Sequence, residues 1–383
     1  MSLTENIPVI IGAGPVGLAF AIMRARANAP VLVLDKQPYP PTHTDKRSLA
    51  LSQGSVALLE SLGLPLSRLT HAPIHHIHIS EQGAWGHTQL HRHIEQVPQL
   101  GVVVRYADLL AQLNALVAQH PQIQMVRPIQ VLACTQVNEH IQLQLSDASQ
   151  LTHSINAPYA VHAEGGLFEP NATHRVRDYR QSAIVSNVQL AKPKPAWAWE
   201  RFTPNGPCAL LPTSADGLHF NLVWCLPTQE ARHTQSLDEA AFLTQINQQI
   251  AHLTGSIIHA ESRHAFALGL RQNHHNSPYQ CSIGNAAQTL HPVAGQGFNL
   301  GLRDAYELNH RLNNASSTAQ ALISLSHHRQ HDRRLTTAIT DGMARGFTVD
   351  FGLSHVRSLA FSVINAQPWL KSRIAQQFMY GLR

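Results

Sequence analysis

The sequence has few charged and few aromatic residues, and it lacks any long apolar run. Charged side chains make up 13% and aromatic side chains 6% of the 383 residues. No apolar run approaches the roughly 18 to 20 residues that a membrane-spanning helix needs. Residues 1–6 carry no basic stretch of the kind that opens a secretory signal. We therefore expect a cytoplasmic protein and leave peripheral contact with the inner membrane open.

Cysteine is scarce, and its spacing indicates neither a disulfide framework nor a metal site. The four cysteines lie far apart, with no C-x-x-C pair and no histidine at matching spacing. We expect buried free thiols in a reducing compartment, and no metal. No serine, cysteine or carboxylate constellation indicates hydrolysis either. The four positions are Cys134, Cys208, Cys225 and Cys281.

The excess of positive charge is small. The net charge of +5 comes from 28 Lys plus Arg against 23 Asp plus Glu, and these residues are scattered. Nucleic-acid binding is therefore not indicated. Attraction to an anionic membrane surface or to an acidic partner stays open.

Histidine, by contrast, is abundant. The chain has 26 histidines, and seven of them lie between His71 and His93. The alternation places Ile77 and Ile79 on one face of a strand and His76 and His78 on the other, which predicts a half-exposed strand. No cysteine or acid pair completes a metal shell there.

A strand, a glycine-rich turn and a helix follow one another near the N-terminus. The apolar residues 7–11 precede a G-x-G-x-x-G pattern, and residues 18–25 have helical periodicity. In this setting, amide groups and the helix dipole hold a pyrophosphate. A second apolar strand, residues 31–34, ends at an acid placed to bind an adenosine ribose. The predicted cofactor-binding residues here are Gly12, Gly14, Pro15, Val16, Gly17, Asp35 and Lys36.

A second glycine-rich segment spans residues 284–304. Three of its glycines fall within seven residues, after a proline and with almost no charge before Arg303. Such a backbone is suited to lie close against a flat polar ligand. The three glycines are Gly295, Gly297 and Gly301.

These two segments together resemble the flavin-dependent aromatic hydroxylases, the family of para-hydroxybenzoate hydroxylase. Within that family the chain is most similar to the ubiquinone-biosynthesis branch, of the 2-polyprenyl-6-methoxyphenol hydroxylase type. Residues 284–304 nearly reproduce the signature of that branch. Residues 200–203, 207–212 and 222–225 are similar to it as well.

The resemblance implies an α/β fold, in which a Rossmann-like FAD-binding domain carries an inserted, mainly antiparallel β-sheet substrate domain and a helical C-terminal region. We predict that residues 1–70, 101–181 and 281–345 form the FAD-binding domain. Residues 71–100 and 182–280 form the substrate domain, and residues 346–383 a C-terminal helical tail. That tail either contacts a membrane or packs on the core and a partner.

Periodicity adds several elements to this outline. It predicts helices over residues 49–64 and 106–117 and in several segments after Asp304. Residues 123–126, 129–133 and 141–145 are predicted to be strands of one small meander. Antiparallel strands are expected from about Ser182.

Several roles follow from the resemblance alone. Arg47 matches an arginine that reaches the flavin diphosphate, and Arg105 falls where the family has a polar cofactor contact. Gly284 and Asn285 match the pair that binds the ribityl chain, where the wider family has aspartate in place of Asn285. An amide can still donate to and accept from hydroxyl groups. Glu164 stands where the family has the aspartate of an Asp-Gly pair, so its longer side chain puts nicotinamide use in doubt.

The predicted catalytic positions lie beside the flavin ring. Pro292 matches a family proline on the substrate side, and His291 is a candidate for proton handling, although a structural histidine is the stronger interpretation. The backbone that follows would offer N–H groups to the pyrimidine end of the flavin, where negative charge gathers on reduction. These residues are Gly295, Gln296, Gly297, Phe298 and Asn299.

The resemblance therefore implies an FAD-dependent monooxygenase that uses NAD(P)H and O2 to hydroxylate a polyprenylated phenol. No second dinucleotide fingerprint exists, so NAD(P)H would bind transiently. Ubiquinone-biosynthesis protein partners and a homo-oligomer stay open. One alternative is a non-catalytic FAD-binding subunit. Another is an oxidase or halogenase, since residues 197–199 faintly resemble a halogenase motif, although Glu200 and Arg201 stand where that motif has Ile-Pro.

Overall fold

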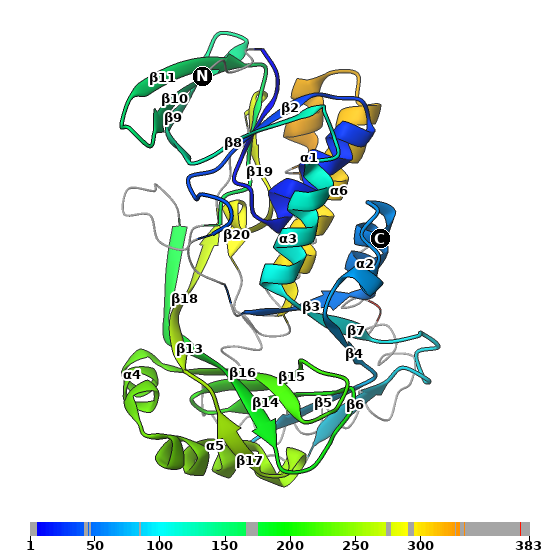
Figure 1. The fold of residues 1–383 in the computed structure, drawn as a ribbon, viewed down its shortest axis with the longest axis vertical. Coiled ribbons are helices and arrows are strands. Elements are labelled where there is room, and N and C mark those ends of the chain that lie inside the picture. Colours follow the sequence, from blue (N-terminus) through cyan, green and yellow to red (C-terminus); the bar gives the residue numbers. More distant parts are fainter. Residues whose placement is uncertain are drawn as a thin grey trace.

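The predicted α/β architecture is confirmed. The computed structural model describes residues 6–41, 45, 47–83, 86–165, 175–272, 277–289, 295–325, 327–329, 333 and 376. A five-stranded parallel sheet with strand order β19-β12-β1-β2-β8 forms the upper part in Figure 1. Its strands are β1 (Val9–Ile11), β2 (Val31–Leu34), β8 (Ile123–Val126), β12 (Ala160–His162) and β19 (Gln280–Ser282).

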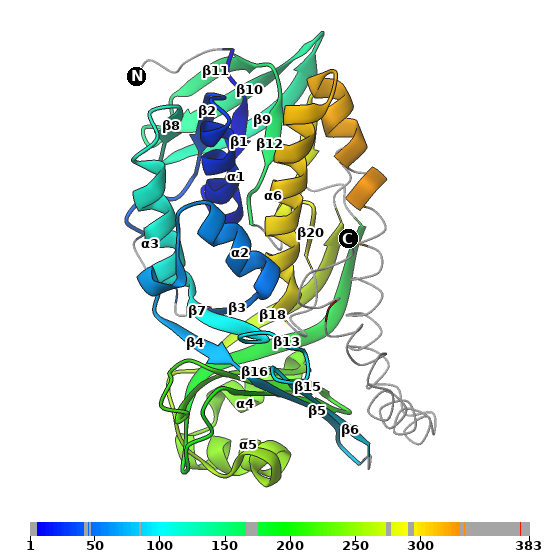
Figure 2. The same ribbon diagram turned by 90° about the vertical axis from the view of Figure 1, so that its right-hand side faces the viewer.

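Three helices cover one face of this sheet. Apolar side chains of α1, α3 and α6 share one core with alternate residues of the strands, among them Ile10, Val33 and Val161. The three helices lie side by side in Figure 2. They are α1 (Pro15–Arg26), α3 (Tyr106–Val117) and α6 (Gln296–Asn314). The predicted helix over residues 106–117 is thereby confirmed.

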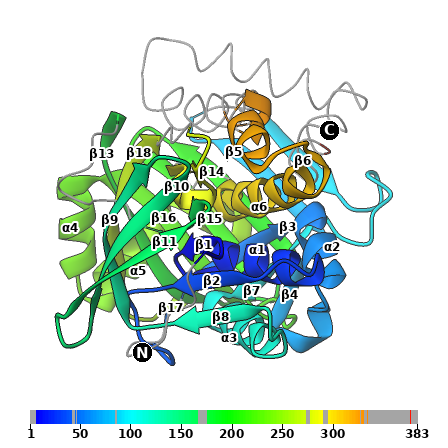
Figure 3. The same cartoon turned by 90° about the horizontal axis from the view of Figure 1, so that it is seen from above.

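A three-stranded antiparallel meander covers the opposite face. It comprises β9 (Ile129–Val137), β10 (His140–Asp147) and β11 (Thr152–Ala157), and it packs against Val9, Ile11 and Leu32. Figure 3 shows the meander and the helices on opposite sides of β1 and β2. The prediction that residues 123–126 belong to this meander is wrong, because this strand pairs in parallel with β2. A short apolar run does not reveal which sheet it will join.

A small sheet in the order β3-β7-β4 lies between the upper and lower parts (Figure 1). Its strands are β3 (Ser48–Ser52), β4 (His71–Ile74) and β7 (Gly101–Arg105), with the short helix η1 (Leu66–Arg68) between β3 and β4. The predicted helix over residues 49–64 is wrong in its first turn. Leu49 to Leu51 pair with Val102 to Val104, and the helix α2 (Gln53–Ser61) begins only after Ser52 caps it by accepting from the Ser55 amide.

The lower part is a nine-stranded sheet in the order β20-β18-β13-β16-β15-β14-β5-β6, with β17 paired to β13. All its pairs are antiparallel except β14 with β5. The helices α4 (Thr228–Ser236) and α5 (Glu239–Thr254) lie below it. The strands are β5 (His76–Glu81), β6 (His87–His91), β13 (Arg175–Leu190), β14 (Trp197–Thr203), β15 (Gly206–Pro212), β16 (His219–Pro227), β17 (Ile257–Ala260), β18 (His264–Gln272) and β20 (Gln288–Thr289).

The two faces of the nine-stranded sheet differ in what covers them. Phe220, Leu222 and Trp224 point toward α5 and pack with Phe242 and Ile246. Residues between them in sequence, such as Val223, point to the other face, which is turned toward the parallel sheet (Figure 1). We call this second face the inner face. Ile74 and Val103 of the small sheet pack against it at Ala198 and Leu211.

The predicted domain ranges do not follow the sheets strictly. The small sheet takes β3 and β7 from ranges assigned to the FAD-binding domain and β4 from a range assigned to the substrate domain. Strand β13 starts at Arg175, before the predicted boundary at Ser182, and β20 joins the nine-stranded sheet. The ranges therefore stay a prediction.

Beyond α6, residues 318–325 are helical, and the later helices predicted for the C-terminal region lie outside the described residues except for residue 376. Within the described part of the chain, no helix is long and apolar enough to span a membrane.

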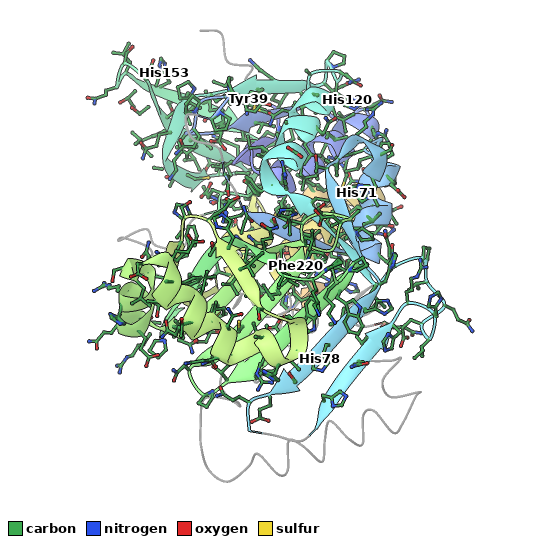
Figure 4. The ribbon with its side chains drawn as sticks, turned by 60° about the horizontal axis from the view of Figure 1, so that its bottom comes forward. Tyr39, His71, His78, His120, His153 and Phe220 are labelled. Atoms are coloured by element: carbon green, nitrogen blue, oxygen red, sulfur yellow. The ribbon has the colours of Figure 1, made fainter. Side chains whose placement is uncertain are left out.

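The histidine-rich strand β5 differs from its prediction. His78 is only 7% exposed, whereas Ile77 and Ile79 are each half-buried. In the register of β5 with β14, His78 lies beside Trp199, whose ring packs on Phe220, so the histidine face is the one that faces α5. Figure 4 shows His78 and Phe220 on this sheet. The predicted strand and its alternation are confirmed, but β5 is more buried than the predicted half-exposed strand, because its histidine side lies on the face of the sheet that α5 covers.

The burial of His78 predicts a loss of stability in acid. Burial, followed by His87, Arg201 and His252, lowers the pKa of His78 to about 4. An unfolded histidine titrates near 6.5. The contribution of neutral His78 to the free energy of unfolding is therefore complete above about pH 6.5 and is lost as the pH falls toward 4. Over this range the free energy of unfolding falls with a limiting slope of about 1.4 kcal/mol per pH unit for one proton.

Urea unfolding between pH 4.5 and 7.5 measures this slope in the wild type and in His78→Phe. The phenyl ring keeps the stacking on His87, whose ring centroid is 5.3 Å away, but it cannot titrate. We expect a shallower pH dependence in the variant. Equal slopes in the two proteins would show that His78 is not the group responsible.

Candidate cofactor-binding site

The G-x-G-x-x-G turn joins the end of β1 to the start of α1 in very close contact with β12. Gly12 has φ +106°, and a Cβ there would lie 2.7 Å from the Glu164 amide nitrogen. A Cβ on Gly17 would collide with the Gly12 carbonyl oxygen. At Gly14, in contrast, an added Cβ would meet no atom within 4 Å. Gly12 and Gly17 therefore serve packing, and Gly14 leaves the turn accessible to a ligand.

The N-terminus of α1 is suited to an anion. Pro15 occupies the first turn, Gly14 is the N-cap, and the helix start has neither a side-chain cap nor an acidic residue. Its free amide groups and the helix dipole therefore favour a negatively charged ligand such as a pyrophosphate.

Asp35 lies beside this turn at the carboxyl end of β2. Its Oδ2 accepts a hydrogen bond from the Ala13 amide at 2.5 Å, and its Oδ1 accepts from the Gln37 amide at 2.7 Å. The carboxylate is thus held next to the proposed pyrophosphate site, as ribose binding requires. Lys36, which follows, is exposed.

The second glycine-rich segment meets the first in space. Gly284 opens the short helix η2 (Gly284–Ala286) with φ +60°, and a Cβ there would lie 3.3 Å from Val16 Cγ1. A Cβ on Gly301 of α6 would lie 2.8 Å from Val16 Cγ2 and 3.0 Å from Gly284 Cα. Val16, Gly284 and Gly301 therefore bring together segments that are more than 260 residues apart in sequence.

The start of α6 forms a second helix N-terminus near this contact. Gly295 is its N-cap in the left-handed conformation, with φ 59°, and the first turn has no side-chain cap and no acidic residue. Gly297 follows, and a Cβ on it would lie 3.8 Å from Asn285 Oδ1. Asn285 itself is exposed. Its amide side chain and the start of α6 therefore border the same space.

Asn299 was predicted to offer only its backbone N–H group to the flavin, but its side chain has a structural function. Its side chain is 1% exposed and makes four hydrogen bonds. Its Nδ2 donates to the carbonyl oxygens of Ala50 and Gly295, and its Oδ1 accepts from the Ser52 amide and the Ser55 hydroxyl. These bonds fix the start of α6 against β3. Gln296 is buried, and Phe298 packs against the main core.

The two predicted arginines lie at adjacent strand ends. Arg47 precedes β3, binds Asp45 through Nε at 3.0 Å and Nη2 at 2.5 Å, and lies over the Tyr106 ring at 5.1 Å. Arg105 ends β7, is exposed, and is paired in register with Ser48. No described hydrogen bond joins either side chain to the contact of Val16, Gly284 and Gly301.

Glu164 contributes its backbone to the turn, where its amide nitrogen lies against Gly12. Its exposed carboxylate lies 3.3 Å from His162 Nδ1. The predicted catalytic residues His291 and Pro292 lie outside the described residues. No group of three or more potential metal ligands occurs within the described ranges.

Sequence reasoning missed Asp304, which is fully buried and bonded to the Gly284 amide. A signal was present in the sequence. Asp304 lies four residues from both Leu300 and Leu308, on the apolar stripe of α6, and all three are buried. A carboxylate on such a stripe must find buried partners.

A family model described as an FAD binding domain matches residues 6–340. The chain belongs to this FAD-binding family. The 3-demethoxyubiquinol 3-hydroxylase of Escherichia coli is 28% identical over 329 residues, covering 82% of this chain and 81% of that protein. A ubiquinone hydroxylase of Rhodospirillum rubrum is 26% identical, covering 98% of this chain and 90% of that protein. The predicted membership among flavin-dependent aromatic hydroxylases is confirmed.

A solved structure shows the same fold. The p-nitrophenol 4-monooxygenase of Pseudomonas putida has a TM-score of 0.76 with 14% identity, covering 99% of this chain and 100% of that chain. The cofactor is FAD, with NAD(P)H as the electron donor typical of the family. The two helix N-termini, the Asp35 carboxylate and the accessible Gly14 suit a ligand that has a pyrophosphate, a ribose and a polar ring system.

Proposed function

We propose that this protein hydroxylates the aromatic ring of a polyprenylated phenol, of the 2-polyprenyl-6-methoxyphenol type, in ubiquinone biosynthesis. The observation that carries the proposal is the meeting of the two glycine-rich segments at Val16, Gly284 and Gly301. It assembles one cofactor site from both parts of the family signature. The ubiquinone-pathway relatives support this substrate class.

The protein's own part in the reaction is binding, orientation and exclusion of water. FAD, when bound, supplies the redox chemistry that connects NAD(P)H, O2 and the ring. We assign Gly14 and the start of α1 to the pyrophosphate, Asp35 to the ribose, and Asn285 to the ribityl chain. The start of α6 would stabilise negative charge on the reduced ring.

The inner face of the nine-stranded sheet supplies an apolar surface for the substrate. Ala183, Cys225 and Leu268 are buried there as one cluster, with Tyr179 and Val223 packed against it. We place the substrate ring between this face and the start of α6. A prenyl tail is insoluble in water, so we also propose peripheral contact with the inner membrane.

The halogenase alternative is disfavoured by the orientation of its only motif. Trp197 and Trp199 are stacked, with ring centroids 5.7 Å apart, and Trp199 packs on Phe220 on the α5 side of the sheet. These rings therefore point away from the inner face.

Isotope labelling tests the proposed reaction. Purified FAD-loaded protein is given NADH or NADPH, a short-chain prenylated methoxyphenol and ¹⁸O₂. We expect a product that carries one ¹⁸O atom on the ring, as mass spectrometry would detect. NAD(P)H oxidation without a labelled product indicates an oxidase, and no turnover despite bound FAD indicates a non-catalytic subunit. Either result rejects the proposal.

A further inference from the structure

Asp304 is a charged residue in a place where charge is costly. It lies in the third turn of α6 and is 0% exposed, between the buried residues Leu300 and Leu308. Burying an ionised carboxylate is strongly unfavourable unless it is both paired and hydrogen-bonded. A carboxylate at this position therefore requires specific partners.

Asp304 has three such partners, drawn from two other parts of the chain. Oδ1 accepts from Arg329 Nε at 2.8 Å, and Oδ2 accepts from Arg333 Nη2 at 2.8 Å. Oδ2 also accepts from the Gly284 amide at 3.2 Å. Arg333 Nη2 in turn donates to the Ser282 carbonyl oxygen at 3.4 Å. The carboxylate thus links α6 to Arg329, to Arg333 and to Gly284, which follows β19.

The two arginines favour the ionised form of Asp304. Burial alone would raise the pKa of Asp304, but the positive charges of Arg333 and Arg329 outweigh burial and hold the pKa below its ordinary value. A charged acceptor makes a stronger hydrogen bond to a backbone amide than a neutral acceptor does.

The Gly284 amide is the link from Asp304 to the cofactor site. Gly284 has φ +60°, packs on Val16 and directly precedes Asn285, whose Oδ1 borders Gly297 at the start of α6. A shift of Gly284 would displace Asn285 relative to α6. We propose that Asp304 is a positioning residue for the flavin half of FAD, acting through the Gly284 amide and without touching the cofactor. This inference depends on FAD binding and not on the identity of the phenol.

The test compares the dissociation constants of FAD and ADP. ADP contains only the half of the cofactor that we assign to the first glycine-rich turn. In Asp304→Asn the side chain keeps an oxygen but loses the charge that pairs with two arginines. We expect the FAD dissociation constant, from flavin fluorescence quenching, to rise at least tenfold. The ADP constant, from competition with FAD, should stay within twofold of the wild type.

Glu307→Gln is the matched control on the same helix. Glu307 pairs with Arg311 at 2.8 Å and lies 3.6 Å from His328, so its change also breaks an ion pair of α6, but it has no described bond to Gly284. Its FAD constant should stay within twofold. Arg329→Lys keeps the positive charge beside Asp304 and is the substitute test if Asp304→Asn does not fold. It should weaken FAD binding by a smaller factor while ADP binding is retained.

Further outcomes distinguish a positioning function of Asp304 from a purely structural one. At saturating FAD, the visible circular dichroism of the bound flavin should differ between Asp304→Asn and the wild type, because its surroundings have moved. A purely structural function of Asp304 would instead lower FAD and ADP affinity by the same factor. That result, or an equal effect of Glu307→Gln, overturns the inference. Unchanged FAD affinity in Asp304→Asn and Arg329→Lys overturns it as well.

Discussion

Gly17→Ala is expected to lose most of its FAD and to be purified as a nearly colourless protein. The added Cβ would collide with the Gly12 carbonyl oxygen and lie 3.2 Å from Ala163 Cβ. Because the backbone and its close-packed neighbours cannot yield easily, the start of α1 must move away from β1. The amide groups of α1 would then no longer point at the pyrophosphate. We expect the FAD dissociation constant to rise about 100-fold, which corresponds to about 2.7 kcal/mol.

Gly14→Ala is the matched control, since it adds the same methyl group three residues earlier, where no protein atom lies within 4 Å. Its apoprotein should melt within about 1 °C of the wild type, whereas the Gly17→Ala apoprotein should melt roughly 3 to 10 °C lower. Because we assign Gly14 to the pyrophosphate, the FAD affinity of this variant should still fall about tenfold. Melting curves without cofactor and FAD titrations separate the two effects. Wild-type FAD affinity in both variants would refute the assignment of the turn.

Local patterns predicted the elements whose structure depends on neighbouring residues. The helix over residues 106–117 followed from Leu109, Leu113 and Leu116, which are all buried on one face. The close packing at Gly12 and Gly17 followed from the G-x-G-x-x-G spacing, which is typical of the turn between a strand and a helix in this kind of unit. In these cases, the same few residues determine both the local structure and its packing.

Other features depend on partners far away in sequence and could not be predicted. Leu49 to Leu51 form a strand because Val102 to Val104 lie beside them, and their apolar spacing also suits a helix. His78 is buried because α5 covers its side of the sheet. Asp304 pairs with arginines 25 and 29 residues later in the chain. In each case, tertiary pairing decides between structures that the local sequence permits equally.

Val223→Trp is expected to abolish hydroxylation while leaving FAD bound. Val223 lies on the inner face of the nine-stranded sheet, between Val185 and Ala209 in register, next to the cluster of Ala183, Cys225 and Leu268. An indole there would occupy the space in which we place the substrate ring. Because catalysis needs the ring within about 3 to 3.5 Å of the reacting atom, we expect kcat/KM for the prenylated phenol to fall at least about 100-fold.

Measurement of FAD affinity and labelled product in the same preparation separates blocking of the substrate from loss of the cofactor. The FAD dissociation constant of Val223→Trp should stay within about twofold of the wild type, since the glycine-rich contact at Val16, Gly284 and Gly301 is formed by other elements. Ile258→Trp is the control, because Ile258 is 53% exposed on β17, and it should leave both quantities unchanged. Full turnover in Val223→Trp would place the substrate elsewhere. A parallel loss of FAD would show that the inner face supports the cofactor site and does not act on the substrate alone.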